Sequence, residues 1–143
     1  MLLDPKKSLC STNQSVVISR DKGQKTEHRA ENPSGKYSIR HYKLDGVLIQ
    51  QEECCDFLLL NDTGYKSYYI ELKGQDVKKA VEQVLAAERK CKSELYQYLS
   101  HYRIVIKKAP VQRNFPKNYR DLLADVGTRR LKLKTMKMEE VLE

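Results

Sequence analysis

The sequence predicts a mixed α/β domain, and three observations support this class. Short runs of strand-forming residues recur in the first half of the chain, most clearly at 54–60 and 67–73. After residue 75 the spacing of apolar residues changes from two to three and four, as expected for a long amphipathic helix. An alternating run returns at 101–107. Strands that alternate with helices in this way predict a sheet with parallel neighbours.

The N-terminal part of the chain has the weakest pattern. Residues 14–20 (QSVVISR) contain several β-branched side chains and predict a short strand. Residues 21–35 are typical of a polar connection, because they are rich in charged residues and end in an Asn-Pro-Ser-Gly turn. We expect one helical turn within this connection, near residues 27–31.

Two hairpins are predicted in the middle of the chain. Residues 37–43 (YSIRHYK) are rich in strand formers, and the Asp-Gly pair that follows predicts a tight turn to a partner strand at 47–50. The runs at 54–60 and 67–73 predict a second hairpin, since an Asn-Asp-Thr-Gly turn separates them.

Helices and single strands alternate in the rest of the chain. The apolar spacing predicts a helix over 76–100 with an aspartate as its N-cap. A crossover of this length should leave the strands at 67–73 and 101–107 parallel to each other. Residues 116–126 predict a second helix that ends at the following glycine, and residues 131–134 predict a last strand.

The composition indicates one globular domain over residues 1–143. No stretch approaches the roughly 18 consecutive apolar residues of a membrane span, and the N-terminus lacks the apolar run of a secretory signal. The four cysteines form no CxxC pair, so neither a zinc site nor a disulfide framework is expected. We therefore expect a cytoplasmic protein with no membrane partner.

The charge distribution favours a polyanionic partner. The formal net charge is +8, and residues 101–137 hold 11 Lys and Arg against two Asp. Such a segment is typical of proteins that contact nucleic-acid backbones, although a solvated basic face that serves solubility is an equal alternative. The candidate phosphate contacts are Arg113, Lys117, Arg120, Arg129, Arg130, Lys132 and Lys134.

Three charged residues, Asp56, Glu71 and Lys73, interrupt the apolar runs of the second hairpin. Burying a charge without a partner is costly, so such positions usually have a reason. Side chains alternate along a strand, which places Glu71 and Lys73 on one face and allows Asp56 to lie beside Glu71. Paired carboxylates suit Mg²⁺ or Mn²⁺, which would polarise a phosphodiester and lower the pKa of an attacking water. The alternative is a solvent-facing Glu71–Lys73 pair with Asp56 as its cross-strand neighbour.

The order of these residues resembles the PD-(D/E)xK nuclease superfamily, which includes restriction endonucleases, Holliday-junction resolvases and repair nucleases. Asp56 is followed by 14 residues and then by Glu-Leu-Lys, on consecutive predicted strands with a helix behind them. The resemblance covers about residues 37–107. It implies a restriction-endonuclease-like mixed β-sheet flanked by helices, with residues 108–143 as a basic C-terminal extension of the same domain.

The resemblance also implies a set of site residues. Asp56, Glu71 and the backbone carbonyl of Leu72 would bind Mg²⁺ or Mn²⁺, and Lys73 would assist catalysis. Gln83, two turns into the following helix, matches the polar residue that many members of the superfamily direct at the site.

A further acidic ligand would complete a second metal position in this superfamily. Glu27, Glu31 and Asp45 are the candidates, and Asp45 is nearest in sequence to the predicted core strands. The chain departs from the superfamily pattern in having Cys55 where the motif has proline.

The predicted function is hydrolysis of phosphodiester bonds in nucleic acid, with DNA as the expected substrate and a homodimer as a possible assembly. A catalytically inactive module that binds nucleic acid or an acidic protein partner is the alternative.

Overall fold

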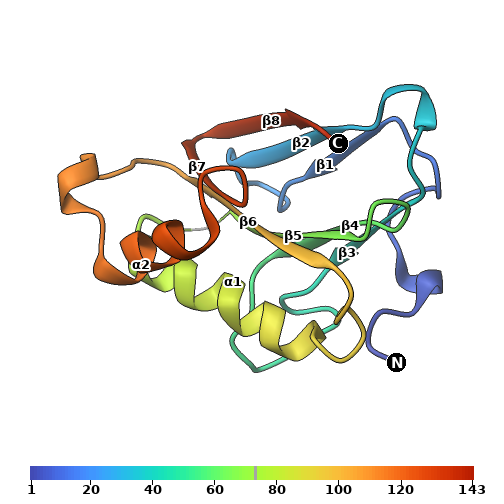
Figure 1. Ribbon diagram of the computed structural model, residues 1–143, viewed down its shortest axis with the longest axis horizontal. Helices are drawn as coiled ribbons and strands as arrows, with labels where there is room; N and C mark the ends of the chain where they lie inside the picture. The colour runs from blue at the N-terminus through green and yellow to red at the C-terminus, as the bar shows by residue number, and fades with distance from the viewer. Residues whose placement is uncertain (73) are drawn as a thin grey trace.

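In residues 1–72 and 74–143, the part of the chain that the computed structural model describes, eight strands and two α-helices form three layers (Figure 1). The strands are β1 (Val16–Ser19), β2 (Glu27–Glu31), β3 (Ile39–Lys43), β4 (Phe57–Asn61), β5 (Lys66–Glu71), β6 (Leu99–Ile106), β7 (Leu131–Thr135) and β8 (Lys137–Val141). The α-helices are α1 (Val77–Cys91) and α2 (Lys117–Val126), and short 3-10 turns lie at Pro5–Lys7, Pro33–Gly35 and Gln112–Asn114.

A five-stranded sheet in the order β3-β4-β5-β6-β7 forms the middle layer. Both helices cover one of its faces, and a three-stranded sheet in the order β1-β2-β8 covers the other (Figure 1). The mixed α/β class predicted from the sequence is therefore confirmed.

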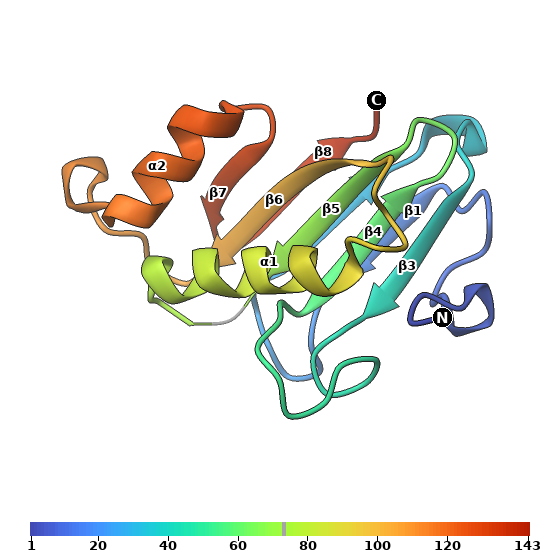
Figure 2. The ribbon, with the colours of Figure 1, turned by 60° about the horizontal axis from the view of Figure 1, so that its bottom comes forward.

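Strand direction gives the large sheet two different edges. The β3–β4 and β4–β5 pairs are antiparallel, whereas β5–β6 and β6–β7 are parallel, as the crossover argument predicts for β5 and β6. Consequently β3, β5, β6 and β7 all end at one side of the sheet, which we call the carboxyl edge (Figure 2). The opposite side, where these strands begin, is the amino edge.

Alternation along the strands produces two hydrophobic cores. On β4, Leu58 and Leu60 face the helices, and Leu59 faces the small sheet together with Ile70 of β5. Both faces of β4 are covered, so all five of its residues are buried. This explains why β4 is a continuous apolar run in the sequence.

The helical turn predicted near residues 27–31 is wrong, because these residues form β2. His28 and Ala30 are buried between the sheets, and the charged residues of the strand alternate with them. A polar strand of this kind lacks the apolar alternation by which strands are recognised, since one of its two inward residues is a histidine.

The first predicted hairpin is also wrong. β3 pairs with β4 along its whole length, and the segment after Asp45 forms only an isolated bridge between Asp45 and Ile49. β3 and β4 are therefore joined by a long connection across residues 44–56 rather than by a tight turn.

The long helix is shorter than predicted, and a last strand was not predicted. α1 ends at Cys91, and turns connect it to β6 through residues 92–98, where Leu95 still packs into the helix-side core. β8 follows β7 after a single residue and pairs in parallel with β2. Asp76 is the N-cap of α1, as expected, and its carboxylate accepts a hydrogen bond from the Lys79 amide.

The strand predicted at 54–60 begins only at Phe57, and the remaining predicted elements agree with the structure to within a few residues. The second helix ends at Val126 with Gly127 as its C-cap, and β7 contains the predicted strand at 131–134. In the described part of the chain, no helix has the length and apolar character needed to cross a membrane.

Candidate metal centre

Two buried carboxylates meet at the carboxyl edge. Asp56 directly precedes β4 and Glu71 is the last residue of β5. The ladder between β4 and β5 ends with the pair of Phe57 and Ile70, so Asp56 and Glu71 lie just beyond its last pair. Their exposed fractions are 1% and 2%. Both acids that the sequence singles out are therefore buried at the same edge of the sheet, at the adjoining ends of β4 and β5.

The backbone holds Asp56 in this position. Its carboxylate oxygen Oδ2 accepts a hydrogen bond of 2.9 Å from the Leu72 amide, and its carbonyl accepts one of 2.9 Å from the Leu44 amide. The first bond ties Asp56 to the end of β5, and the second extends its pairing with β3. The carboxylate thus has a defined orientation before any ligand binds.

The negative charges of both acids affect the pKa of the neighbouring Cys55 thiol. Burial raises the pKa of Cys55 well above its usual value, and the negative charges of Glu71 and Asp56 raise it further. Both carboxylates therefore act on one buried thiol, which stays protonated and packs as a small apolar group.

A lysine that the sequence analysis did not identify lies against Asp56. The ammonium Nζ of Lys43 is 3.4 Å from Asp56 Oδ1 and 3.0 Å from Asp21 Oδ1, so the two carboxylate oxygens are separated by no more than the sum of these distances. The same ammonium lies 4.8 Å from the centre of the Phe57 ring. Only 18% of the Lys43 side chain is exposed. Lys43 thus places a positive charge between two acids from different layers.

The carbonyl of Leu72, the third predicted ligand, already accepts one hydrogen bond. It comes from the hydroxyl of Thr26, at 2.5 Å. Thr26 is buried and directly precedes β2, so the small sheet supports the end of β5. A carbonyl oxygen has two lone pairs and can accept a second partner beside Thr26.

The two other predicted catalytic residues are Lys73 and Gln83. Lys73 lies outside the described residues. Gln83 is half-buried on α1, seven positions before Lys90, whose ammonium donates to the Glu53 carbonyl at 2.7 Å. Residues seven apart lie on one helix stripe, so the Gln83 stripe faces the segment that leads into β4.

The predicted third acids do not complete a cluster. In residues 1–72 and 74–143, no group of three or more His, Cys, Asp or Glu side chains is arranged to hold a metal ion. Glu27 lies on β2 within 3.6–3.7 Å of Arg20 and Lys137, and Glu31 pairs with Arg29.

Asp21 is an additional acid near Asp56, because both carboxylates contact the ammonium of Lys43. No sequence pattern indicates it, because its position depends on how the small sheet packs.

The donor set at the carboxyl edge fits a hard divalent cation. Mg²⁺ in phosphoryl-transfer sites is commonly held by one or two carboxylates, with water and substrate phosphate completing the shell. Asp56, Glu71 and the Leu72 carbonyl offer oxygen ligands only, which suits Mg²⁺ or Mn²⁺ better than zinc.

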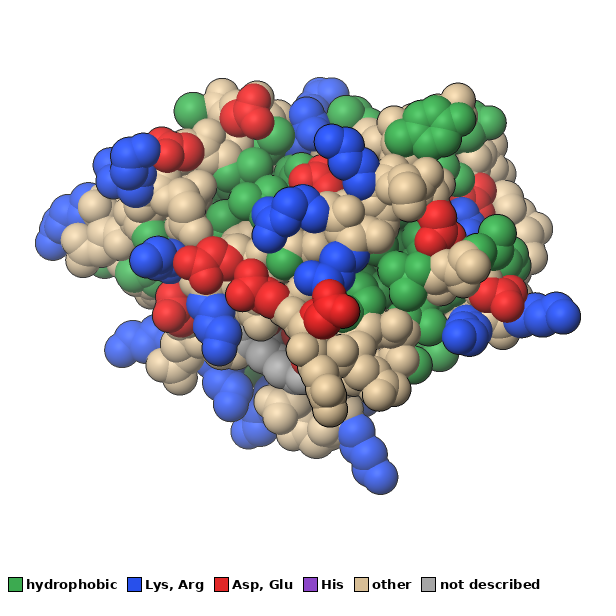
Figure 3. Space-filling model, turned by 90° about the horizontal axis from the view of Figure 1, so that it is seen from below, with side chains coloured by type: hydrophobic (Ala, Val, Ile, Leu, Met, Phe, Trp, Pro, Cys, Tyr) green, Lys and Arg blue, Asp and Glu red, His purple; other side chains and the backbone are tan. Residues whose placement is uncertain are grey.

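The structure divides the predicted phosphate contacts between several places. Arg129 and Arg130 directly precede β7, toward the amino edge. Lys132 pairs with Arg103, one residue before the row of Glu71, and Lys134 pairs with Val105, one residue beyond that row. Lys117 pairs with Asp121 at 2.6 Å on α2. Arg113 lies in the 3-10 turn Gln112–Asn114, and Arg120 lies on α2. Lys and Arg side chains are spread over several parts of the face that Figure 3 shows. The C-terminal basic region is therefore not one continuous surface.

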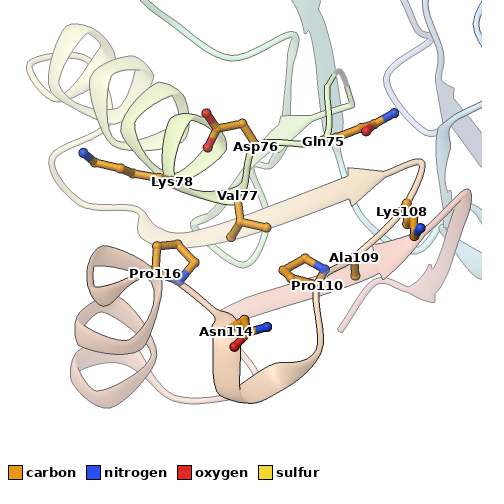
Figure 4. A pocket seen from close by; sticks show the side chains of 9 residues that line it. All are labelled: Gln75, Asp76, Val77, Lys78, Lys108, Ala109, Pro110, Asn114 and Pro116. Atoms are coloured by element: carbon orange, nitrogen blue, oxygen red, sulfur yellow. The ribbon is translucent and has the colours of Figure 1, made fainter.

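A pocket of about 660 Å³ lies between the start of α1 and the segment after β6. In Figure 4, Val77, Pro110 and Pro116 line its interior, and Lys78 and Lys108 lie at its rim. Gly74, with φ 87°, is in the left-handed region that glycine tolerates, and it lies where the chain turns from β5 toward this pocket.

Comparisons with protein-family models, with curated proteins and with solved structures found no match.

Proposed function

We propose that the protein is a metal-dependent nuclease of the PD-(D/E)xK type, with a restriction-endonuclease-like core, that hydrolyses phosphodiester bonds of DNA. The observation that carries the proposal is the pair of buried carboxylates, Asp56 and Glu71, at the carboxyl edge. The antiparallel β4–β5 pair, the α1 crossover and the parallel β6 agree with the order of elements around that motif.

In this proposal the chain prepares the site for Mg²⁺ or Mn²⁺. Asp56, Glu71 and the Leu72 carbonyl would hold the ion, and a bound ion would supply the charge that polarises the scissile phosphate and lowers the pKa of the attacking water. The Leu72 amide keeps Asp56 oriented, so little reorganisation is needed. Lys73, next along the chain, offsets charge that develops on the phosphate, and Gln83 orients the water.

The test is cleavage of a panel of linear, nicked, branched and single-stranded DNA and of RNA, with and without Mg²⁺ or Mn²⁺. Glu71→Gln and Lys73→Ala should abolish cleavage, whereas Glu82→Gln, an exposed glutamate on α1, should leave it unchanged. Calorimetric titration with Mn²⁺ provides a second readout, and Glu71→Gln should weaken that binding at least tenfold.

Absence of both cleavage and Mn²⁺ binding in a folded wild-type protein would overturn the proposal. Cleavage that persists in Glu71→Gln would overturn the assignment of the site.

A second candidate function is a nuclease-fold module without catalysis that binds nucleic acid or an acidic protein. The contact of Lys43 with Asp56 favours it, because an ammonium between two carboxylates reduces the negative charge that attracts a metal. This candidate predicts nucleic-acid or protein binding that is insensitive to Mn²⁺.

A further inference from the structure

Four exposed lysines lie in connections at the carboxyl edge. Lys107 and Lys108 directly follow β6, and Lys22 and Lys25 lie in the connection between β1 and β2. In the described part of the chain, these carboxyl-edge lysines have no ion-pair partner. None of them belongs to the set of basic residues that the sequence analysis proposed for phosphate contacts.

Lys22 and Lys25 lie on the side of the candidate site where β3 and β4 run. Lys22 follows Asp21, which shares the ammonium of Lys43 with Asp56. Lys25 precedes Thr26, whose hydroxyl donates to the Leu72 carbonyl. Each lysine of the pair is thus adjacent in sequence to a residue that contacts the site directly or through one side chain.

Lys107 and Lys108 lie on the other side of Glu71. β6 is the neighbour of β5 away from β4, so residues that follow Ile106 emerge beyond Glu71 in the strand order. Lys108 also lies at the rim of the 660 Å³ pocket, opposite Lys78 of α1 (Figure 4). The two lysine pairs therefore flank the Asp56–Glu71 site.

Lys66 and Arg129, the cations of the amino edge, lie farther from the site. Lys66 begins β5, five residues before Glu71, and at about 3.3 Å per residue the two are roughly 16 Å apart along the strand. Arg129 lies in the turn before Leu131, which pairs with Tyr102 and so lies in the same row as Tyr69. The backbone of this segment is also fixed, because Arg103 donates to the carbonyls of Arg129 and Arg130.

We propose that the carboxyl-edge lysines bind backbone phosphates of a nucleic acid on both sides of the Asp56–Glu71 site, an inference that rests on the proposed nuclease function. A lysine ammonium is a strongly hydrated point charge that neutralises phosphates without reading base sequence. The surface would thus hold DNA across the site with affinity that depends steeply on salt. The amino-edge cations make no part of this surface.

The test measures fluorescence anisotropy of a labelled DNA duplex in EDTA, so that metal binding and cleavage play no part. Three double variants remove the same charge: Lys107→Gln with Lys108→Gln, Lys22→Gln with Lys25→Gln, and Lys66→Gln with Arg129→Gln. Each carboxyl-edge double variant should bind roughly five- to tenfold more weakly, with a salt dependence shallower by about one per lysine. The amino-edge double variant should stay within about twofold of the wild type.

A larger loss in the amino-edge variant, or no loss in either carboxyl-edge variant, overturns the inference. Unchanged affinity in all three variants would favour an acidic protein partner instead. The nuclease proposal is judged separately. If the wild type cleaves DNA but only the amino-edge double variant loses DNA affinity, the proposed phosphate-binding surface is refuted and the nuclease function is not. If the carboxyl-edge double variants lose DNA affinity but the wild type shows no metal-dependent cleavage, the nuclease function is refuted and the phosphate-binding surface is not.

Discussion

Lys43 balances part of the negative charge of the candidate site. Its ammonium contacts Asp56 and Asp21, which come from the large-sheet layer and from the connection between two strands of the small sheet. A cation at this position offsets the repulsion between neighbouring carboxylates in a largely buried setting. A divalent ion that bound Asp56 would supply the same charge, so Lys43 and the metal have overlapping electrostatic roles.

This overlap leads to a prediction for Lys43→Met. The variant keeps much of the apolar stem but loses the charge, and its free energy of unfolding should fall by about 1–3 kcal/mol. Mn²⁺ should raise the melting temperature of the variant more than that of the wild type. Differential scanning calorimetry with and without Mn²⁺ measures both effects.

Lys66→Met is the matched control for this measurement. Lys66 lies at the amino edge and donates to the Glu143 carbonyl, far from Asp56. Equal responses of the two variants to Mn²⁺ would contradict an overlap between Lys43 and the metal.

The sequence identifies some site residues and not others, for a physical reason. Asp56 and Glu71 are recognisable because each interrupts an apolar run, and the hairpin register that joins them is local. Lys43 and Asp21 are neighbours only because the small sheet packs on the large one. No periodicity within either segment carries that information.

At the scale of elements, β8 and β2 are held to the large sheet by one buried ionic network. Glu140 of β8 accepts a hydrogen bond from His28 at 2.6 Å and another from Arg103 of β6 at 2.7 Å. Burial would raise the pKa of Glu140, but the hydrogen bonds from His28 and Arg103 outweigh it and lower the pKa to about 2. The network explains how two charged segments, unpredicted as strands, are joined to the large sheet.

Glu140→Gln should therefore destabilise the protein in a pH-dependent way. The pKa of Glu140 is depressed in the folded state from 4.5 to about 2, so its contribution is complete above pH 4.5 and is lost as the pH falls toward 2. We expect the variant to lose about 2–4 kcal/mol of unfolding free energy at pH 7 and much less near pH 2. Urea denaturation across this range measures the difference.

Glu139→Gln, at an exposed position on the same strand, should change the unfolding free energy by less than about 0.5 kcal/mol at every pH. A pH-independent loss in Glu140→Gln would mean that shape, rather than charge, holds β8 in place.

The accuracy of the predicted elements follows the same logic. β4 and β5 were predicted because burial on both faces makes them apolar, and α2 because Gly127 ends it. The 76–100 helix was predicted too long because Leu95 and Tyr98 continue the apolar spacing within turns that still pack on the core. Patterns of burial are visible in sequence, but the backbone conformation that achieves the burial is not always visible.

At the scale of the whole molecule, two buried histidines make the fold sensitive to mild acid. Burial lowers the pKa of His41 to about 4, with a smaller contribution from His28. Burial also lowers the pKa of His101 to about 4, with a contribution from Arg103. Both pKa values lie below the unfolded value of 6.5, so the unfolded chain takes up protons first as the pH falls.

The unfolding free energy should accordingly fall as the pH is lowered from 6.5 toward 4, by up to about 3 kcal/mol for each histidine. Urea denaturation at intervals between pH 7 and pH 4 measures this loss. The double variant His41→Gln with His101→Gln should be less stable at pH 7 and should lose much less over the same interval. A double variant with the full pH dependence of the wild type would assign the acid sensitivity to other groups.

The number of sites per chain sets how the proposed nuclease acts on duplex DNA. One Asp56–Glu71 pair can hydrolyse one strand at a time, so a single chain should nick supercoiled plasmid before it linearises it. If two chains act together, the rate of linearisation should rise more steeply than in proportion to protein concentration, whereas nicking should stay proportional. Gel analysis of plasmid forms over a hundredfold range of concentration separates these cases. Linear product without a nicked precursor at the lowest concentration would show that a preformed dimer, rather than the single chain, is the catalytic unit.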